Sequence, residues 1–257
     1  MSQSTITIDQ YSVATVPIQM LFNTTELGLG TGFLWQEDDA LFLITNWHNL
    51  SGRDPFTGKH ISATAAEPNQ LRVWWNQKGN LGSKFAIDHP IKDANGSALW
   101  SVHPTHKNQV DAVALPITLP PNAEPYAINK MPADDLLLQV GMDVFILGYP
   151  FGISSGGFPI WKRGSIASEP QLLEPARPVI FVDSASRPGM SGSPVIRRSW
   201  NSHAMANGST AIGPGSATKI VGIYSGRLAT SDPNDPQLGL TWPVAFDLPL
   251  RFSSTRS

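Results

Sequence analysis

The hydrophobic positions of the chain fall into many short runs, which glycines, prolines and polar clusters separate. Several runs alternate apolar and polar residues and are rich in β-branched and aromatic side chains, a pattern typical of half-buried strands. Segments with a helical period do not exceed about three turns. The pattern therefore predicts an all-β fold, with strands at residues 12–22, 28–35, 40–45, 71–75, 84–87, 110–117, 144–148, 158–167, 179–183, 221–227 and 240–246, and one that begins at Val195.

A proline-rich segment divides these strands into two groups. Residues 119–125 hold three prolines in seven positions, which favours an extended and stiff connector. We predict an N-terminal β-domain over residues 12–118 and a C-terminal β-domain over residues 126–247. The long polar stretch 197–219 is expected to be a solvated loop, with a mobile flap or a partner contact as the alternatives.

Composition and charge narrow the function classes. The 257 residues carry 18 Lys and Arg against 20 Asp and Glu, so no basic field suggests a nucleic-acid partner. The chain has no cysteine, which excludes disulfides, thiolate metal sites and a cysteine nucleophile. Residues 1–5 lack the features of a secretory signal, and no stretch approaches the roughly 20 apolar residues of a membrane span. We therefore expect a cytoplasmic protein that does not associate with membranes.

The segment Ser186–Val195 is predicted to be a tight turn that presents Ser191. Gly189 and Gly192 bracket this serine, and glycine permits positive φ and a close approach of a ligand. A serine in such a turn can be a nucleophile if a histidine reaches its hydroxyl and an acid orients that histidine. The N–H groups of Gly189 and Ser191 would then point at a developing oxyanion. Taken alone, the same pattern is equally typical of a Gly/Pro/Ser surface loop.

Two upstream segments supply suitable partners for Ser191. Residues 43–48 form an apolar strand that ends in His48, and in residues 109–115 Asp111 opens an alternating apolar strand. The order His48, Asp111, Ser191 resembles that of the chymotrypsin-like (trypsin-like) serine peptidases. The bacterial high-temperature-requirement and glutamyl-endopeptidase branches are the most similar, and the resemblance covers roughly residues 15–246.

Together with the strand pattern, this resemblance implies two six-stranded antiparallel β-barrels with the active site in the cleft between them. His48 and Asp111 would come from the first barrel and Ser191 from the second. The implied activity is that of a serine endopeptidase: Ser191 attacks, His48 moves the proton, Asp111 orients His48, and Gly189 and Ser191 form the oxyanion hole. No metal or organic cofactor is implied, and the substrate is a protein or peptide.

The resemblance also indicates the residues of a specificity pocket. Ala185, with Ser186 beside it, aligns with the position that usually floors this pocket, so the lack of an aspartate there disfavours cleavage after Lys or Arg. Tyr224 replaces the histidine of glutamyl-specific members, and Arg227 could narrow the pocket or attract an acidic side chain. We expect a small or apolar residue before the cleaved bond. The candidate substrate-binding residues are Ala185, Ser186, Tyr224, Ser225, Gly226 and Arg227.

Three alternatives stay open. The chain could be a catalytically silent module that binds a peptide by strand addition along residues 225–227. The same triad could serve an esterase or acyl transferase. An activating or inhibiting protein partner could control the site. His103 and His106 lie three residues apart and could suggest a metal site, but we expect them to pack in a loop, because proline interrupts the pair and no cysteine is available.

Overall fold

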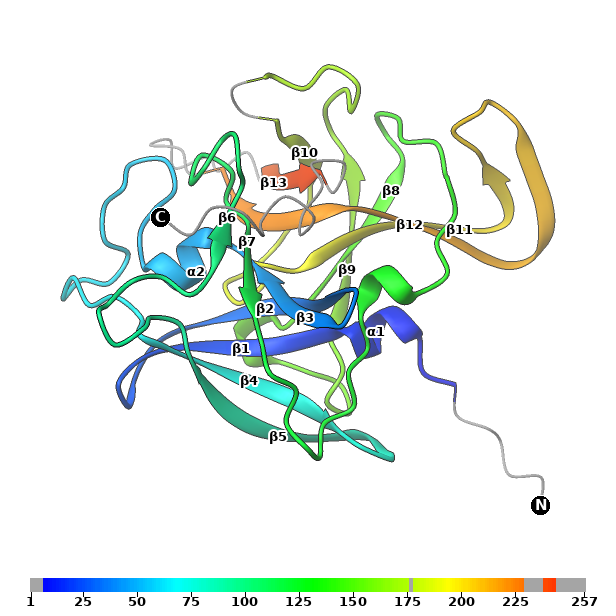
Figure 1. Cartoon of the computed structure of the whole chain (residues 1–257). Coiled ribbons are helices and arrows are strands. Elements are labelled where there is room, and N and C mark those ends of the chain that lie inside the picture. Colours follow the sequence, from blue (N-terminus) through cyan, green and yellow to red (C-terminus); the bar gives the residue numbers. More distant parts are fainter. Residues whose placement is uncertain (1–6, 176–177, 229–237, 244–257) are drawn as a thin grey trace.

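We describe the protein from a computed structural model, which describes residues 7–175, 178–228 and 238–243 (Figure 1). Strands dominate these residues, and the predicted all-β, two-sheet class is confirmed. No helix in the described ranges is long and apolar enough to cross a membrane. The elements in chain order are α1 (Gln10–Ala14), β1 (Thr15–Phe22), β2 (Thr25–Glu37), β3 (Ala40–Thr45), α2 (Trp47–Ser51), β4 (Gln70–Gln77), β5 (Asn80–Pro90), β6 (Ser101–Val102), β7 (Val113–Pro116), η1 (Ile128–Lys130), β8 (Asp143–Gly148), η2 (Pro150–Gly152), β9 (Ile160–Ile166), β10 (Ile180–Asp183), β11 (Pro194–Ala204), β12 (Thr210–Arg227) and β13 (Leu238–Pro243).

The first sheet is antiparallel with the order β5-β4-β1-β2-β3-β7-β6. It has seven strands rather than the expected six, because the two-residue strand β6 pairs with β7 in a segment expected to be loop. Strand β4 shows why the sequence folds this way: Leu71, Val73 and Trp75 alternate with less buried residues and point into the core. Asp38 and Asp39 form the turn between β2 and β3, and the predicted range of β3 is confirmed.

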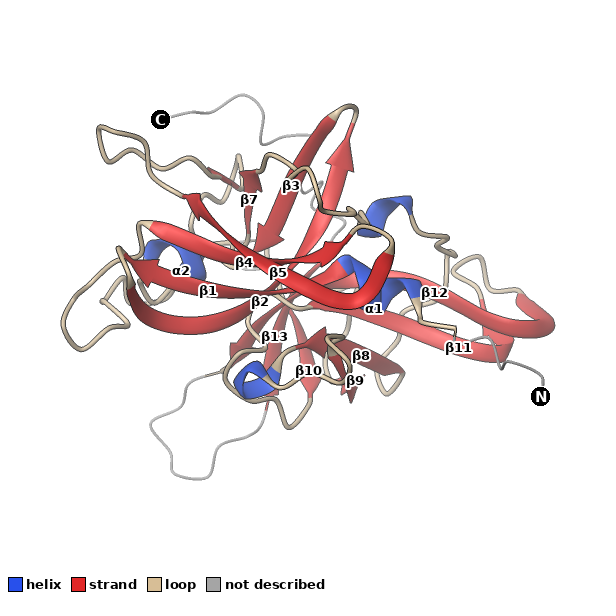
Figure 2. Cartoon of the chain, turned by 90° about the horizontal axis from the view of Figure 1, so that it is seen from below, coloured by secondary structure: helices blue, strands red, loops and turns tan. Residues whose placement is uncertain are grey.

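The second sheet is a closed six-stranded barrel with the order β10-β13-β12-β11-β8-β9, as expected. The two sheets meet along one hydrophobic cluster that includes Phe33 and Ile44 from the first sheet and Leu147, Ile196 and Ile223 from the second. Figure 2 shows the two sheets side by side, with β1–β5 in one and β8–β10 and β13 in the other. Segments from both sheets, residues 48–52 and 188–191, line one common cavity.

The expectation of a loop over residues 197–219 is wrong. These residues continue β11 and open β12, which form a long antiparallel hairpin that projects beyond the barrel (Figure 1). Asn207 and Gly208 stand at its tip, and the N–H of Met205 bonds the carbonyl of Ser209 at 2.9 Å. The outer part has no hydrophobic face, since Ile212 is 85% exposed and its neighbours are small or polar. Asn-Gly is the hairpin signal that would have revealed it.

Two smaller differences concern strand ends. Residues 12–14 belong to α1 rather than to the first strand, because Asp9 caps a short helix by accepting the N–H of Tyr11 at 2.9 Å. The last predicted strand is found as β13, and its predicted residues 244–246 lie outside the described residues. Neither difference affects the cleft.

Candidate active site

His48 was expected at the end of a strand, but it lies on the first turn of the short helix α2. Strand β3 stops at Thr45, and Asn46 then precedes the helix with its side-chain amide bonded to the carbonyl of Asp111 at 2.7 Å. The helix ends at Gly52, whose N–H bonds the carbonyl of His48 at 3.0 Å. Both ends of the helix are therefore tied down, and the imidazole has a fixed place at the cleft.

Asp111 meets His48 because of the register of the first sheet. Strands β3 and β7 are antiparallel neighbours in which Thr45 pairs with Val113, so the residues after β3 lie beside the residues before β7. Asp111 precedes β7 by two residues in a stretch that is buried from residue 110 to residue 115, so the expected alternation is wrong. The pairing of β3 with β7 brings the carboxylate of Asp111 beside the imidazole of His48.

The carboxylate of Asp111 is fully buried and has donors on both oxygens. Its Oδ2 lies 2.6 Å from His48 Nδ1 and also accepts the hydroxyl of Ser225, and its Oδ1 accepts the backbone N–H of His48 at 2.9 Å. A buried carboxylate is stable only when such partners replace its lost hydration. Sequence analysis had placed Ser225 with the substrate-binding residues. The register of β12 shifts at this position, and the hydroxyl of Ser225 bonds Asp111.

The pKa of His48 reflects two opposing effects. Burial disfavours the imidazolium and would by itself lower the pKa of His48. The charge of Asp111 and its hydrogen bond, with a smaller contribution from the charge of Asp54, outweigh burial and raise this pKa above its ordinary value. An imidazole held in this way is well suited to accept a proton and to carry the resulting charge.

The turn that carries Ser191 is held by backbone groups. The N–H of Met190 bonds the carbonyl of Arg187 at 3.2 Å, and Gly189 takes the left-handed φ of 93° that this turn requires. After the serine, the N–H of Gly192 bonds the carbonyl of Tyr224 at 2.9 Å with a φ of 87°. A side chain at Gly192 would collide with the backbone of β2. Only glycine fits both of these positions.

Two peptide groups in this turn have their direction fixed by hydrogen bonds to their carbonyl oxygens. The carbonyl of Pro188 accepts the N–H of Phe151 at 2.7 Å, and the carbonyl of Met190 accepts the N–H of Ser193 at 3.1 Å. In a trans peptide the N–H points opposite to the carbonyl. The N–H groups of Gly189 and Ser191 are therefore directed away from these contacts, and neither makes a hydrogen bond within the described part of the chain. Such a pair can bind an oxyanion.

A buried threonine links this turn to the first sheet. The hydroxyl of Thr31 donates to the carbonyl of Gly189 at 2.8 Å and accepts the N–H of Tyr149 at 3.2 Å. Its own N–H donates to the carbonyl of Ser191 at 2.8 Å. Thr31, like Phe151, was not among the residues singled out from the sequence, because its role depends on backbone atoms that are distant in the chain.

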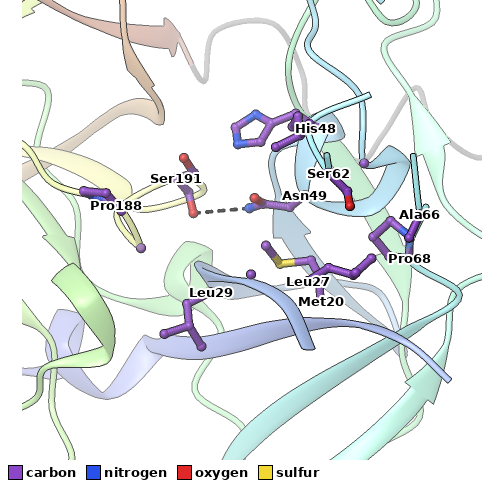
Figure 3. A pocket seen from close by; sticks show the side chains of 14 residues that line it. Met20, Leu27, Leu29, His48, Asn49, Ser62, Ala66, Pro68, Pro188 and Ser191 are labelled. Carbon is purple, nitrogen blue, oxygen red and sulfur yellow. Dashed lines mark hydrogen bonds between the residues drawn. The ribbon is translucent and has the colours of Figure 1, made fainter. Parts of the chain in front are cut away.

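Ser191 and His48 line the same cavity of about 270 Å³. Figure 3 shows the hydroxyl of Ser191 on the side of the residue that faces the His48 ring, while its carbonyl faces Asn49. The side-chain amide of Asn49 donates to that carbonyl at 3.3 Å. The described contacts include no hydrogen bond between the side chains of Ser191 and His48, which is common in sites without substrate.

A second cavity, of about 380 Å³, also includes Ser191 and is lined by Ser186, Arg187, Pro188, Ser191, Gly226 and Arg227. Arg227 donates to the carbonyl of Ser186 at 2.6 Å, and Arg187 donates to the same carbonyl at 3.1 Å. The hydroxyl of Ser186 bonds that of Tyr224, which is fully buried behind it. Ala185 is exposed and is not among the lining residues, so Ser186 rather than Ala185 faces the cavity.

The two neighbouring histidines act as loop-packing groups. The Nδ1 of His103 accepts the N–H of Thr105 at 3.2 Å and the N–H of His106 at 3.0 Å. The rings of His103 and His106 lie 4.9 Å apart. Within the described ranges no three His, Asp or Glu side chains are grouped as a metal site would need.

Comparisons with known proteins identify the family and the fold of the chain. Residues 30–205 match the family model of the trypsin-like peptidase domain, a range that contains His48, Asp111 and Ser191. A comparison with curated proteins gave no significant match. Among solved structures, the serine endoprotease from Yersinia pestis aligns with a TM-score of 0.52 at 15% identity, over 95% of this chain and 65% of that one. Deg5 aligns with a TM-score of 0.50 at 15% identity, over 91% of this chain and 85% of that one.

These structural likenesses concern the fold alone, because identity is low, and the chain spans about two thirds of the length of the Yersinia pestis protein. The family match is of a different kind, since it covers more than half of the chain and includes all three triad positions. The chain therefore belongs to the trypsin-like peptidase family.

Proposed function

We propose that the chain is a serine endopeptidase that cleaves peptide bonds in protein or peptide substrates through an acyl-enzyme. One observation carries the proposal. Three segments that are distant in the chain bring His48, Asp111 and Ser191 to one cleft, with His48 Nδ1 2.6 Å from Asp111 and with Ser191 and His48 on the wall of one cavity. A silent peptide-binding module would have no use for this arrangement.

The geometry supports the following division of roles. Ser191 Oγ attacks the substrate carbonyl, and the Nε2 of His48 takes the hydroxyl proton and later gives it to the leaving amine. Asp111 accepts a hydrogen bond from Nδ1–H of His48, which keeps the proton on Nδ1, leaves Nε2 as the basic nitrogen and stabilises the imidazolium. The N–H groups of Gly189 and Ser191 bind the oxyanion of the tetrahedral intermediate. A water molecule then attacks the acyl-enzyme with His48 as the base.

The proposal is tested by intact mass after treatment with a fluorophosphonate, which reacts with activated serines. We expect one adduct on the native chain and none on Ser191→Ala or His48→Ala. Ser193→Ala is the matched control, because its hydroxyl is buried and lacks a hydrogen-bond partner within the described residues. This variant should keep the adduct.

Peptide-bond cleavage is the second readout. Incubation with unfolded casein should produce new peptide N-termini with the native chain and not with Ser191→Ala. An adduct on Ser191 together with ester hydrolysis but no casein cleavage would favour an esterase or acyl transferase. Failure of the native chain to form an adduct would refute the proposed nucleophile.

A further inference from the structure

The cavity shared by His48 and Ser191 has an apolar wall that the catalytic chemistry does not require. Its apolar side chains come from β1, β2 and the loop that follows α2 (Figure 3). This wall consists of Met20, Leu27, Leu29, Ile61, Ala66 and Pro68. Its volume of about 270 Å³ lies below the range of about 300–1,000 Å³ that drug-sized ligands occupy, so the cavity fits one side chain rather than a peptide segment.

Apart from His48 and Ser191, the polar side chains that line this cavity are those of Asn49 and Ser62, and both have hydrogen-bond partners. Asn49 donates to Thr45 and to the carbonyl of Ser191, and Ser62 bonds the hydroxyl of Thr64 at 2.9 Å. His48 is the one titratable residue among the lining residues. A charged side chain placed here would lose its hydration without gaining an ion pair, whereas an aliphatic or aromatic side chain would gain burial.

The position of the cavity relative to the reacting atoms identifies which part of a substrate it holds. His48 returns the proton to the leaving amine, so the leaving group lies on the side of His48. The apolar cavity continues from His48 past Asn49 and Gly52 to the loop at Ile61. The cavity with Ser186 and Arg227 shares only Pro188 and Ser191 with it and does not include His48. We therefore assign the apolar cavity to the leaving-group side of the bond to be cleaved and the other cavity to the acyl side.

We propose that the apolar cavity binds the side chain of the residue that follows the cleaved bond, and that it selects aliphatic or aromatic residues over charged ones. The proposal rests on the proposed acyl-enzyme. The same site would receive an amine that attacks the acyl-enzyme in place of water. In that step a C–N bond forms, the bond from the acyl carbon to Ser191 Oγ breaks, and the amine proton passes through His48 to Ser191 Oγ.

Amine trapping tests the site without knowledge of the preferred acyl residue. The native chain is acylated with p-nitrophenyl acetate, and the amides of Leu, Phe, Gly, Asp and Lys compete with water. Mass spectrometry measures the acetylated amides formed. We expect Leu-amide and Phe-amide to trap the acyl group roughly tenfold to a hundredfold more efficiently than Gly-amide or Asp-amide.

Two matched variants, Ile61→Asp and Ile212→Asp, test whether the preference among the amides arises at this cavity. Both isoleucines are exposed, by 57% and 85%, so neither change disturbs the core. Ile61→Asp should reduce trapping by Leu-amide relative to Lys-amide, while Ile212→Asp, at the far end of the β11–β12 hairpin, should keep the native preference. An acylated chain that shows no preference among the amides would overturn this proposal and leave the proposed function standing.

Direct binding covers the case in which Ser191 is not acylated and the proposed function fails. The full chain is titrated with Leu-amide and with Asp-amide, and the chemical shifts of its backbone N–H groups are followed by NMR. Shifts at Ile61 and Gly189 with Leu-amide alone would support an apolar binding site in a protein without the proposed chemistry. No shift with either amide would refute the site as well.

Discussion

The two halves of the molecule hold their parts of the site by different means. The first sheet supplies His48 and Asp111, which side-chain hydrogen bonds around a buried carboxylate hold in place. The second sheet supplies Ser191 and the N–H groups of Gly189 and Ser191, which have no hydrogen-bond partner among the described residues and which backbone bonds and two left-handed glycines hold in place. The first half therefore depends on the chemistry of particular side chains, and the second on the path of the main chain.

The two halves are therefore sensitive to different kinds of substitution. Replacing one atom of a buried hydrogen-bonded carboxylate changes the charge and the tautomer of its partner without moving the backbone. In the Ser191 turn, side-chain chemistry matters less than whether the peptide groups keep their direction. The three changes below are expected to separate these two kinds of dependence, from the largest effect to the smallest.

Asp111→Asn should be the most damaging of the three. In asparagine an NH₂ group replaces one of the two carboxylate oxygens, both of which now accept hydrogen bonds from His48. An NH₂ group can only donate, so facing Nδ1 it favours the imidazole tautomer with its proton on Nε2. That tautomer cannot take the proton from Ser191. We expect the rate of turnover to fall by about 10⁴ with the fold retained, measured on a peptide substrate and by circular dichroism.

Asp143→Asn is the matched control, because this carboxylate is exposed on β8 and pairs with Arg163. It should keep the native rate, since exposed ion pairs contribute about 0–1 kcal/mol. A loss of less than tenfold in folded Asp111→Asn would contradict the view that the first half works through this carboxylate.

Gly189→Ala should damage the second half without touching the His48–Asp111 pair. A Cβ at this position would collide with the carbonyl oxygen of Tyr149, and alanine disfavours the φ of 93°. The turn must shift, and the Gly189 N–H shifts with it. Losing one oxyanion donor costs about 10²–10³ in rate, and the loss should appear in kcat.

Gly208→Ala is the control that distinguishes a changed direction of the Gly189 N–H group from the backbone strain of an alanine at positive φ. Gly208 also has a left-handed φ, 84°, but nothing lies within 4 Å of the Cβ that alanine would add. Its thermal stability should fall by a similar backbone penalty of about 1 kcal/mol while its rate stays native. Equal rates for the two variants would show that the Gly189 N–H does not contribute.

The same contrast explains what the sequence could predict. The range 40–45 of β3 follows from its apolar run and the turn residues before it, and the closed second barrel follows from the strand pattern together with the resemblance to serine peptidases. The candidates His48, Asp111 and Ser191 follow from the same resemblance. The contacts of Ser225 with Asp111 and of Phe151 with Pro188 could not be predicted. They join residues from distant segments, and they depend on a register shift and on a peptide direction that leave no periodic pattern.

The error over residues 197–219 has a related cause. The inner parts of β11 and β12 are strands of the barrel, but the outer part of their hairpin extends beyond it, and residues 210–216 of β12 are exposed or only half-buried. Hydrophobic alternation arises only where one face is buried. Polar composition therefore resembled a loop, although the Asn207-Gly208 turn indicated a hairpin.

Asp54→Asn should have the smallest effect and should act on the first half alone. The charge of Asp54 helps to raise the pKa of His48, after burial and the larger contribution of Asp111. Asparagine keeps a side-chain oxygen for the N–H groups of Phe56 and Thr57, so the loop should hold. Without the charge the imidazolium is less favoured, the pKa of His48 falls, and the neutral base persists to lower pH.

The acidic limb of the pH–rate profile of Asp54→Asn should therefore move to lower pH by less than about half a unit at low salt, since this carboxylate is largely exposed. At 1 M salt, where the Debye length is about 3 Å, the displacement should shrink. Gly189→Ala should leave the position of this limb unchanged while lowering the plateau, because it alters a backbone donor and no charge near His48. If Asp54→Asn moved the limb to higher pH, or if Gly189→Ala moved it as much, the division between a charge-controlled half and a backbone-controlled half would be wrong.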